Sequence, residues 1–293
     1  AGAVVVTLVG GATAFLLLRD EQGPVTAAGA TAGLRRSVAV IGFRNLSGRE
    51  DVDWIGTALV EMMTTELAIG EQLRTVTVDA VERMKRELAI GETDALDPAR
   101  LASVGRRLGT DLVVTGSYLA IGEKIRLDVR LMDIGTGEAL VSVSESDRAT
   151  ELIDLVARAG ASLRRNLRAD EVSAEQQGDL RASVPATAEA ARLYATGRAR
   201  LRAFDAMAAR AAFEQVTAQE PEFALGHAGL ADALTLLGMG EAAVAASERA
   251  LALVQPLRRE ERLGIELRHH VARGAWDPAI AVARNLHELF PDD

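Results

Sequence analysis

Apolar and polar residues follow two different periods between residues 37 and 168. The run 37–44 (SVAVIGFR) is apolar and rich in β-branched residues, which predicts a buried central strand. Over residues 124–131 apolar and charged residues alternate, which predicts a strand with one face in solvent. We expect four apolar side chains of this strand to face the helices: Ile125, Leu127, Val129 and Leu131. The opposite face should carry Arg126, Asp128 and Arg130.

Helical periodicity and helix-start residues separate the strands. Further strands are predicted at 73–78, 112–119 and 139–144, and helices at 54–68, 80–88, 98–108 and 150–167. Asp53, Asp79 and Asp97 each stand at the start of a predicted helix, where a carboxylate can cap free backbone N–H groups. Gly109 should end the third helix. This order of elements predicts an α/β (α+β) domain with a mixed sheet over residues 37–168.

Residues 1–18 form an uncharged apolar run. As a helix the run would span about 27 Å, close to the roughly 30 Å of a bilayer's hydrocarbon core. No basic segment precedes it and no small-residue cleavage site follows it, so a signal peptide fits less well, as does a buried helix. We predict an N-terminal transmembrane helix over 1–18 and a turn-rich tether over 19–36. Because the chain opens directly on this run without Met, we also expect a further upstream part.

The second half of the chain has no strand-like run. Residues 169–185 are polar and irregular and are predicted to be a linker. Beyond them Pro221, Pro256 and Pro291 recur at intervals of 35 residues, which indicates a helical repeat.

Small and aromatic residues near these prolines fit the tetratricopeptide pattern. We therefore predict an all-α array of tetratricopeptide-like repeats over 186–293, truncated at its C-terminus, with a plain helical bundle as the alternative. In such repeats small side chains allow two helices to approach each other closely. We expect three alanines at these closest approaches: Ala209, Ala243 and Ala279.

Composition narrows the possible functions. Aromatic residues make up only 3% of the 293 residues, so the core must consist mainly of Ala, Val, Leu and Ile, which favours packed helices. The net charge of -9 argues against sequence-independent binding to nucleic acid, and we expect no nucleic-acid partner. The chain has no cysteine, which excludes disulfides, thiol catalysis and cysteine-ligated metals.

No motif predicts catalysis, a cofactor or a metal. The four histidines are never spaced i, i+4, as a metal-binding pair on one helix would be. Asn45-Leu46-Ser47 matches the N-glycosylation pattern, but we interpret it as a polar turn before a helix, and Ser47 has no candidate base nearby. Gly135 and Gly137 are too few for a nucleotide loop and are interpreted as a turn.

A cluster of arginines is the strongest candidate for binding. Arg198 and Arg202 are spaced i, i+4 on the first predicted repeat helix, and Tyr194 lies four residues before Arg198. We predict that Tyr194, Arg198 and Arg202 bind the acidic segment of a protein or peptide partner in the repeat groove, because the arginine fork can hold a carboxylate with two hydrogen bonds. The alternative is a solvated face on which the arginines pair with Asp205 and Glu189.

Three stretches resemble the TolB amino-terminal-like domain: SVAVIGFRNLSGREDVDWIGTALVEMMTTEL, LGTDLVVTGSYL and IRLDVRLMDIGTGEALVSVSE. A membrane span, this domain and tetratricopeptide repeats together are similar to the extracytoplasmic half of bacterial eukaryotic-like serine/threonine kinases, whose kinase lies upstream of the span. The chain itself has no kinase motif. A similar arrangement follows the DNA-binding domain of membrane-bound transcription regulators.

The resemblance implies a membrane-anchored, non-catalytic sensory or interaction module on the extracytoplasmic (periplasmic) side. The alternatives are a scaffold for envelope assembly or export and the ectodomain of a transcription regulator. An enzyme with an unrecognised site is a weaker alternative, and we do not expect this chain to be an enzyme.

Overall fold

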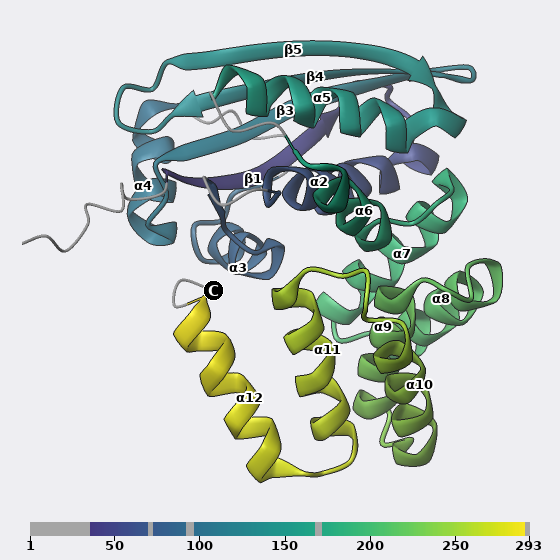
Figure 1. Ribbon diagram of the computed structural model, residues 1–293. Coiled ribbons are helices and arrows are strands. Elements are labelled where there is room, and N and C mark those ends of the chain that lie inside the picture. Colours follow the sequence, from purple (N-terminus) through teal and green to yellow (C-terminus); the bar gives the residue numbers. More distant parts are fainter. Residues whose placement is uncertain (1–35, 70–72, 92–96, 168–171, 291–293) are drawn as a thin grey trace, which may run out of the picture. The chain divides into compact units, whose positions relative to one another are not determined.

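The computed structural model describes residues 36–69, 73–91, 97–167 and 172–290, which belong to one compact unit, Arg36–Asp293 (Figure 1). The predicted transmembrane helix over 1–18 and the tether over 19–36, except Arg36, lie outside the described residues. Within the described ranges, none of the helices combines the length and the apolar character that crossing a membrane requires.

A mixed five-stranded sheet forms the first half of this unit, with the strand order β2-β1-β3-β4-β5. The interior strand β1 (Arg36–Asn45) runs parallel to its two neighbours, β2 (Leu73–Thr75) and β3 (Leu112–Ile121). β3, β4 (Lys124–Asp133) and β5 (Ala139–Arg148) form an antiparallel meander. The mixed sheet followed by helices is the predicted α+β arrangement.

Helices cover both faces of the sheet (Figure 1). They are α2 (Trp54–Leu67), α3 (Val78–Glu87), α4 (Pro98–Leu108) and α5 (Leu152–Asn166), with single 3-10 turns η1 (Glu50–Val52) and η2 (Ala149–Glu151) before α2 and α5. Apolar side chains of α2 and α5 share one core with the sheet, and those of α3 and α4 form a second core on the opposite face.

The predicted orientation of β4 is confirmed. Leu127 and Leu131 are fully buried in the core beneath α2 and α5, and the side chains of Ile125 and Val129 are only 1% exposed. Arg126 and Arg130 are exposed on the other face.

Of the three predicted caps, Asp79 is wrong, and Asp53 stands at the N-cap of α2 without making the cap bond. α3 begins earlier than predicted, because the Thr77 hydroxyl accepts the backbone N–H of Ala80 at 3.3 Å; Asp79 therefore lies within the first turn, and β2 ends at Thr75. Asp53 makes no cap bond to α2, and its carboxylate accepts instead from the side-chain amide of Asn45 at 2.7 Å.

The cap of α4 is confirmed. The Asp97 carboxylate accepts the backbone N–H of Arg100 at 2.8 Å. Gly109 ends the helix with a φ of 59°, which glycine adopts without the strain a side chain would add.

The segment 169–185 was predicted to be an irregular linker, but it contains helix α6 (Ala174–Ser183). A reciprocal cap at Ser173 and Gln176 starts this helix.

Three packed helix pairs follow α6 (Figure 1). They are α7 (Ala188–Arg202) with α8 (Ala206–Gln219), α9 (Ala224–Leu236) with α10 (Gly240–Ala252), and α11 (Arg259–Ala272) with α12 (Trp276–Leu289). Ala209, Ala243 and Ala279 are buried, to 0%, 0% and 4% exposure. A Cβ added at Gly229 would come within 2.4 Å of the Phe213 ring, so α8 and α9 meet where only glycine fits.

Candidate functional site

The three predicted binding residues lie on a face of α7 that contacts the α/β part. Arg202 Nη1 donates to Glu61 Oε1 of α2 at 2.6 Å. Arg198 Nη2 donates to the Asp79 carboxylate of α3 at 3.3–3.4 Å, and its Nε lies 3.8 Å from Glu61. The side chains of Glu61 and both arginines are only 15–18% exposed. We call Glu61, Asp79, Arg198 and Arg202 the ion-pair cluster.

The arginines of α7 have two kinds of partner. Glu189 pairs with Arg192 and Asp205 lies 3.5 Å from Arg200, as the solvated-face alternative requires. Arg198 and Arg202 instead pair with acids more than one hundred residues away in the sequence. Burial by itself lowers the pKa of Arg198, but the nearby Glu61, Tyr194 and Asp79 raise it by more. The pKa therefore lies above its ordinary value, and the guanidinium stays charged.

Tyr194 packs against the core of the helix pairs. Its ring packs edge-on against Phe223, with centroids 5.2 Å apart, and against Phe213 at 5.9 Å. Burial raises the pKa of the Tyr194 hydroxyl to about 12. Tyr194 is therefore a packing residue that positions α7 rather than an open stacking surface.

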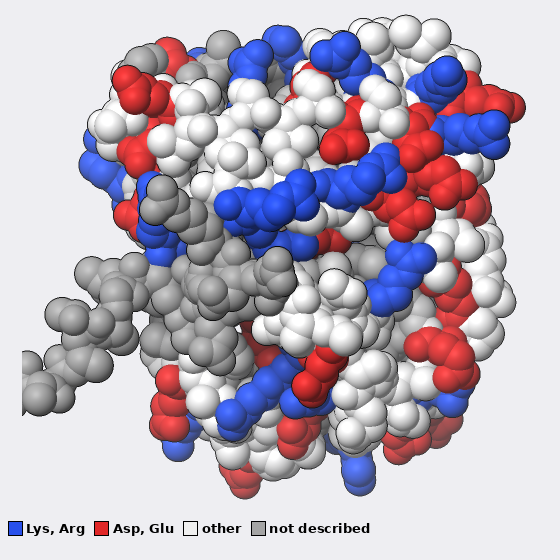
Figure 2. Space-filling view, turned by 45° about the horizontal axis from the view of Figure 1, so that its top comes forward, with Lys and Arg blue, Asp and Glu red and all other residues white. Residues whose placement is uncertain are grey.

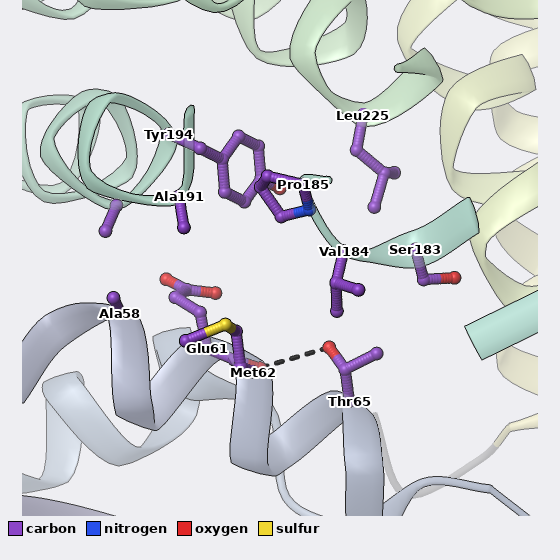
Figure 3. A pocket seen from close by; sticks show the side chains of 11 residues that line it. Ala58, Glu61, Met62, Thr65, Ser183, Val184, Pro185, Ala191, Tyr194 and Leu225 are labelled. Atoms are coloured by element: carbon purple, nitrogen blue, oxygen red, sulfur yellow. Dashed lines mark hydrogen bonds between the residues drawn. The ribbon is translucent and has the colours of Figure 1, made fainter. Parts of the chain in front are cut away.

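A small pocket lies between α2 and α7 (Figure 3). Glu61 and Met62 point into it from α2, while Tyr194 and Pro185 lie on its opposite side. Its volume of about 40 Å³ has room for water but not for a metabolite, which needs roughly 300 Å³ or more. It is a packing gap between the two halves of the unit.

A larger groove of about 610 Å³ lies between α3 and the first helices of the three pairs, α7, α9 and α11. We call it the basic groove. Five arginines line it: Arg83, Arg86, Arg198, Arg202 and Arg268. Its apolar lining consists of Leu201, Phe204, Leu236, Leu267 and Val271.

The arginines of the basic groove differ in their partners. Arg198 and Arg202 belong to the ion-pair cluster, and Arg268 pairs with Asp232 at 2.9 Å. Within the described part of the chain, Arg83 and Arg86 have no ion-pair partner, and both are exposed. Two positive charges are therefore available to a ligand in the groove.

Sequence reasoning missed Arg83 and Arg86. They are spaced i, i+3 on α3, whose other face is buried through Val81 and Met84, and this amphipathic pattern was the signal available. The tertiary fold places α3 across the groove from the helix pairs, and no local sequence pattern predicts this arrangement.

Figure 2 shows charged residues of both signs on one face of the molecule, with a band of Lys and Arg across its middle and Asp and Glu beside it. The net charge of the chain is -9, so Arg83 and Arg86 do not belong to a generally basic protein.

The loop and turn interpretations agree with the structure. Ser47 Oγ accepts the backbone N–H of Ala120 at 2.7 Å, and Asn45 donates to the Arg49 carbonyl at 2.8 Å, so both side chains hold the loop. Gly137, with a φ of 70°, closes the turn between β4 and β5. No group of three or more His, Asp or Glu side chains among the described residues is placed to hold a metal ion.

The sequence matches no family model and no curated protein. Several solved structures are similar to part of it. The LpoB C-terminal domain from Salmonella enterica is 19% identical, with a TM-score of 0.33 over 39% of this chain and 83% of that chain. Lipoprotein GNA1162 from Neisseria meningitidis is 21% identical, with a TM-score of 0.34 over 44% and 96%. TolB from Acinetobacter baumannii is 12% identical, with a TM-score of 0.31 over 45% and 28%.

Proposed function

We propose that this chain is a non-catalytic interaction module that holds an acidic segment of a partner protein in the basic groove. The observation that supports the proposal is the pair Arg83 and Arg86, which line the groove without an ion-pair partner among the described residues. A carboxylate can accept two parallel hydrogen bonds from one guanidinium, so acidic side chains suit these positions.

The size and lining of the groove agree with a peptide ligand. Its volume of about 610 Å³ lies within the range of ligand sites, and apolar side chains contribute to its lining beside the charged ones. Arg198 and Arg202 line the same groove, but their charges are already balanced by Glu61 and Asp79. The part of Arg198 and Arg202 in partner binding stays a prediction, and in our proposal they shape the groove while Arg83 and Arg86 attract the ligand.

The cellular setting of the module rests on the sequence resemblance. We propose that the helix pairs are tetratricopeptide-like repeats and that the sheet is a TolB amino-terminal-like domain. Together they would form the extracytoplasmic part of a membrane-anchored bacterial receptor with a serine/threonine kinase upstream. A scaffold for envelope assembly or export would use the groove in the same way. The upstream reading frame distinguishes these settings, because it encodes a kinase, a DNA-binding domain, or only a signal or lipoprotein segment.

Peptide display with a random library tests the groove. We expect the 293-residue chain to enrich peptides rich in Asp and Glu, with binding that weakens as salt is added, because exposed charges are screened over about 8–10 Å at physiological ionic strength. Arg83→Glu/Arg86→Glu should abolish the enrichment. Arg259→Glu/Arg284→Glu changes the charge equally at exposed positions outside the groove and should retain it.

The proposal fails if basic or uncharged peptides are enriched. It also fails if a single-stranded oligonucleotide binds more tightly than the selected peptides.

A further inference from the structure

The three helix pairs share one turn, but one of them has an unexpected residue in it. Phe204, Gly238 and Gly274 each follow the C-cap of the first helix and have φ values of 59°, 71° and 65°. Their backbone N–H groups donate to equivalent carbonyls, those of Leu201, Thr235 and Val271, at 2.9–3.0 Å. The first pair therefore holds phenylalanine where the other two hold glycine.

Phenylalanine is a costly choice at this position. In the left-handed conformation Cβ crowds the following carbonyl, and glycine avoids this crowding because it has no Cβ. Among the described residues Ala89, at a φ of 49°, is the only other non-glycine residue with positive φ, and its side chain is small. A strained backbone that carries a bulky side chain is most often found where the side chain serves a function.

The ring of Phe204 gains little from its own chain. It is 85% exposed, the most exposed of the large apolar side chains in the described residues. It lines the basic groove together with Leu236 of α9, which is 56% exposed. Leu267 and Val271 of α11 continue the apolar lining.

We propose that Phe204 is a docking residue of the basic groove. Its ring, with Leu236, receives an apolar side chain of a partner segment whose neighbouring carboxylates meet Arg83 and Arg86. This inference rests on the proposed function and specifies the ligand, which is a segment of another protein that is both acidic and apolar.

Charge and shape favour this occupant over others. Arg83 and Arg86, which have no ion-pair partner among the described residues, favour anionic groups, while the exposed Phe204 ring and Leu236 favour an apolar group. One acidic segment with an apolar residue supplies both. Leu267 and Val271 line the same groove and offer further apolar contact to such a segment.

Replacing Phe204 with the residue of the other two turns separates binding from folding. We expect Phe204→Gly to raise the Tm of the chain by about 2–4 °C, because the left-handed strain is relieved. Phe204→Asn should act similarly, since Asn tolerates this conformation and is less flexible than Gly in the unfolded chain.

The probe is a fluorescein-labelled peptide of glutamate and serine with a single central leucine. Phe204→Gly and Phe204→Asn should weaken its binding about tenfold or more, the effect of losing a buried apolar contact. The same peptide with serine in place of leucine should bind the original chain and both variants with equal, lower affinity. Met207→Ser removes another exposed apolar side chain, 63% exposed and outside the groove, and should leave the leucine peptide's binding unchanged.

Several outcomes overturn the docking role. If the leucine peptide binds the Phe204 variants and the original chain equally well, but Arg83→Glu/Arg86→Glu abolishes its binding, the docking role fails and the proposed function stands. If no acidic peptide binds the original chain, both the docking role and the proposed function fail.

A lower Tm of Phe204→Gly would show that the ring stabilises the turn. Phe204-dependent binding to phosphatidylglycerol vesicles would assign the ring to a membrane, and Phe204-dependent self-association in sedimentation would assign it to a second copy.

Discussion

Arg202 donates a 2.6 Å hydrogen bond to Glu61, and this contact joins α7 of the first helix pair to α2 of the α/β part. The same halves are also joined by Arg198 of α7, which donates to Asp79 of α3 at 3.3–3.4 Å, and by the Arg258 guanidinium, which donates to the carbonyl of Ala68 at the C-cap of α2 at 3.4 Å. The helix pairs are therefore fixed to the sheet domain by side chains that lie far apart in the sequence.

Glu61→Gln should destabilise the chain by about 1–3 kcal/mol, because it leaves Arg198 and Arg202 partly buried with less opposing charge. Urea unfolding measures the loss. As a matched control, Glu214→Gln removes an acid paired with Arg210 within α8, 48% exposed, and should cost only about 0.3–0.5 kcal/mol. Equal losses for the two variants would contradict a structural role for the ion-pair cluster.

Leu127→Asp should cost several kcal/mol, because a charge would be placed without a partner in the core beneath α2 and α5. Thermal unfolding by circular dichroism reports it. Arg130→Gln, on the opposite face of the same strand, should change the free energy of unfolding by no more than about 0.5 kcal/mol. Unchanged melting of Leu127→Asp would refute the burial of this face.

Ala209→Leu should overpack the contact between α7 and α8 and cost about 1–3 kcal/mol. Ala211→Leu lies on the exposed side of α8 and should be nearly neutral, within about 0.5 kcal/mol. Chemical denaturation of the two variants makes the comparison. A neutral Ala209→Leu would mean that the helix pair is loosely packed at this alanine.

Asp111 should make stability depend on pH at the acid end. The backbone N–H of Ser37 lowers the pKa of the Asp111 carboxyl most, burial opposes this, and the Ser37 hydroxyl and nearby arginines lower the pKa further. Because the folded-state pKa is below the unfolded one, the contribution is present above the ordinary carboxyl pKa and is lost as pH falls through the folded pKa. Asp111→Asn should lower the free energy of unfolding slightly at pH 7, and the difference should shrink below about pH 4. Asp154→Asn, with a side chain 57% exposed, serves as the control for the substitution itself. Urea titrations at both pH values test this, and a difference that does not change with pH would contradict it.

The sequence predicted the elements whose signals are local. Alternation along β4, the Asp97 cap and Gly109 depend only on neighbouring residues, and all three agree with the structure. Asp53 and Asp79 look like caps in the same way. Their carboxylates instead have partners brought near by folding, Asn45 for the first and Arg198 with Arg202 for the second.

The candidate site shows the same limit. The i, i+4 spacing of Arg198 and Arg202 correctly placed both on one face of a helix. Their partner Glu61 lies 141 residues from Arg202, and the unpaired Arg83 lies on a helix of the other half. No local pattern marks Phe204, because its left-handed backbone exists only in the folded chain.

The position of β1 in the sheet has a consequence during synthesis of the chain. β1 lies between β2 and β3, and β3 is made much later than β1: Ser37 meets Asp111 across a separation of 74 residues. While the ribosome is still adding those residues, Val38 and Val40 have no β3 to pack beside, whereas the later meander and helix pairs need only nearby sequence. Nascent chains stalled before β3 should therefore be cleaved readily within β1 and bind chaperones, and chains stalled after β5 should be protected. Early protection of β1 would mean that another segment shields the strand until its neighbour emerges.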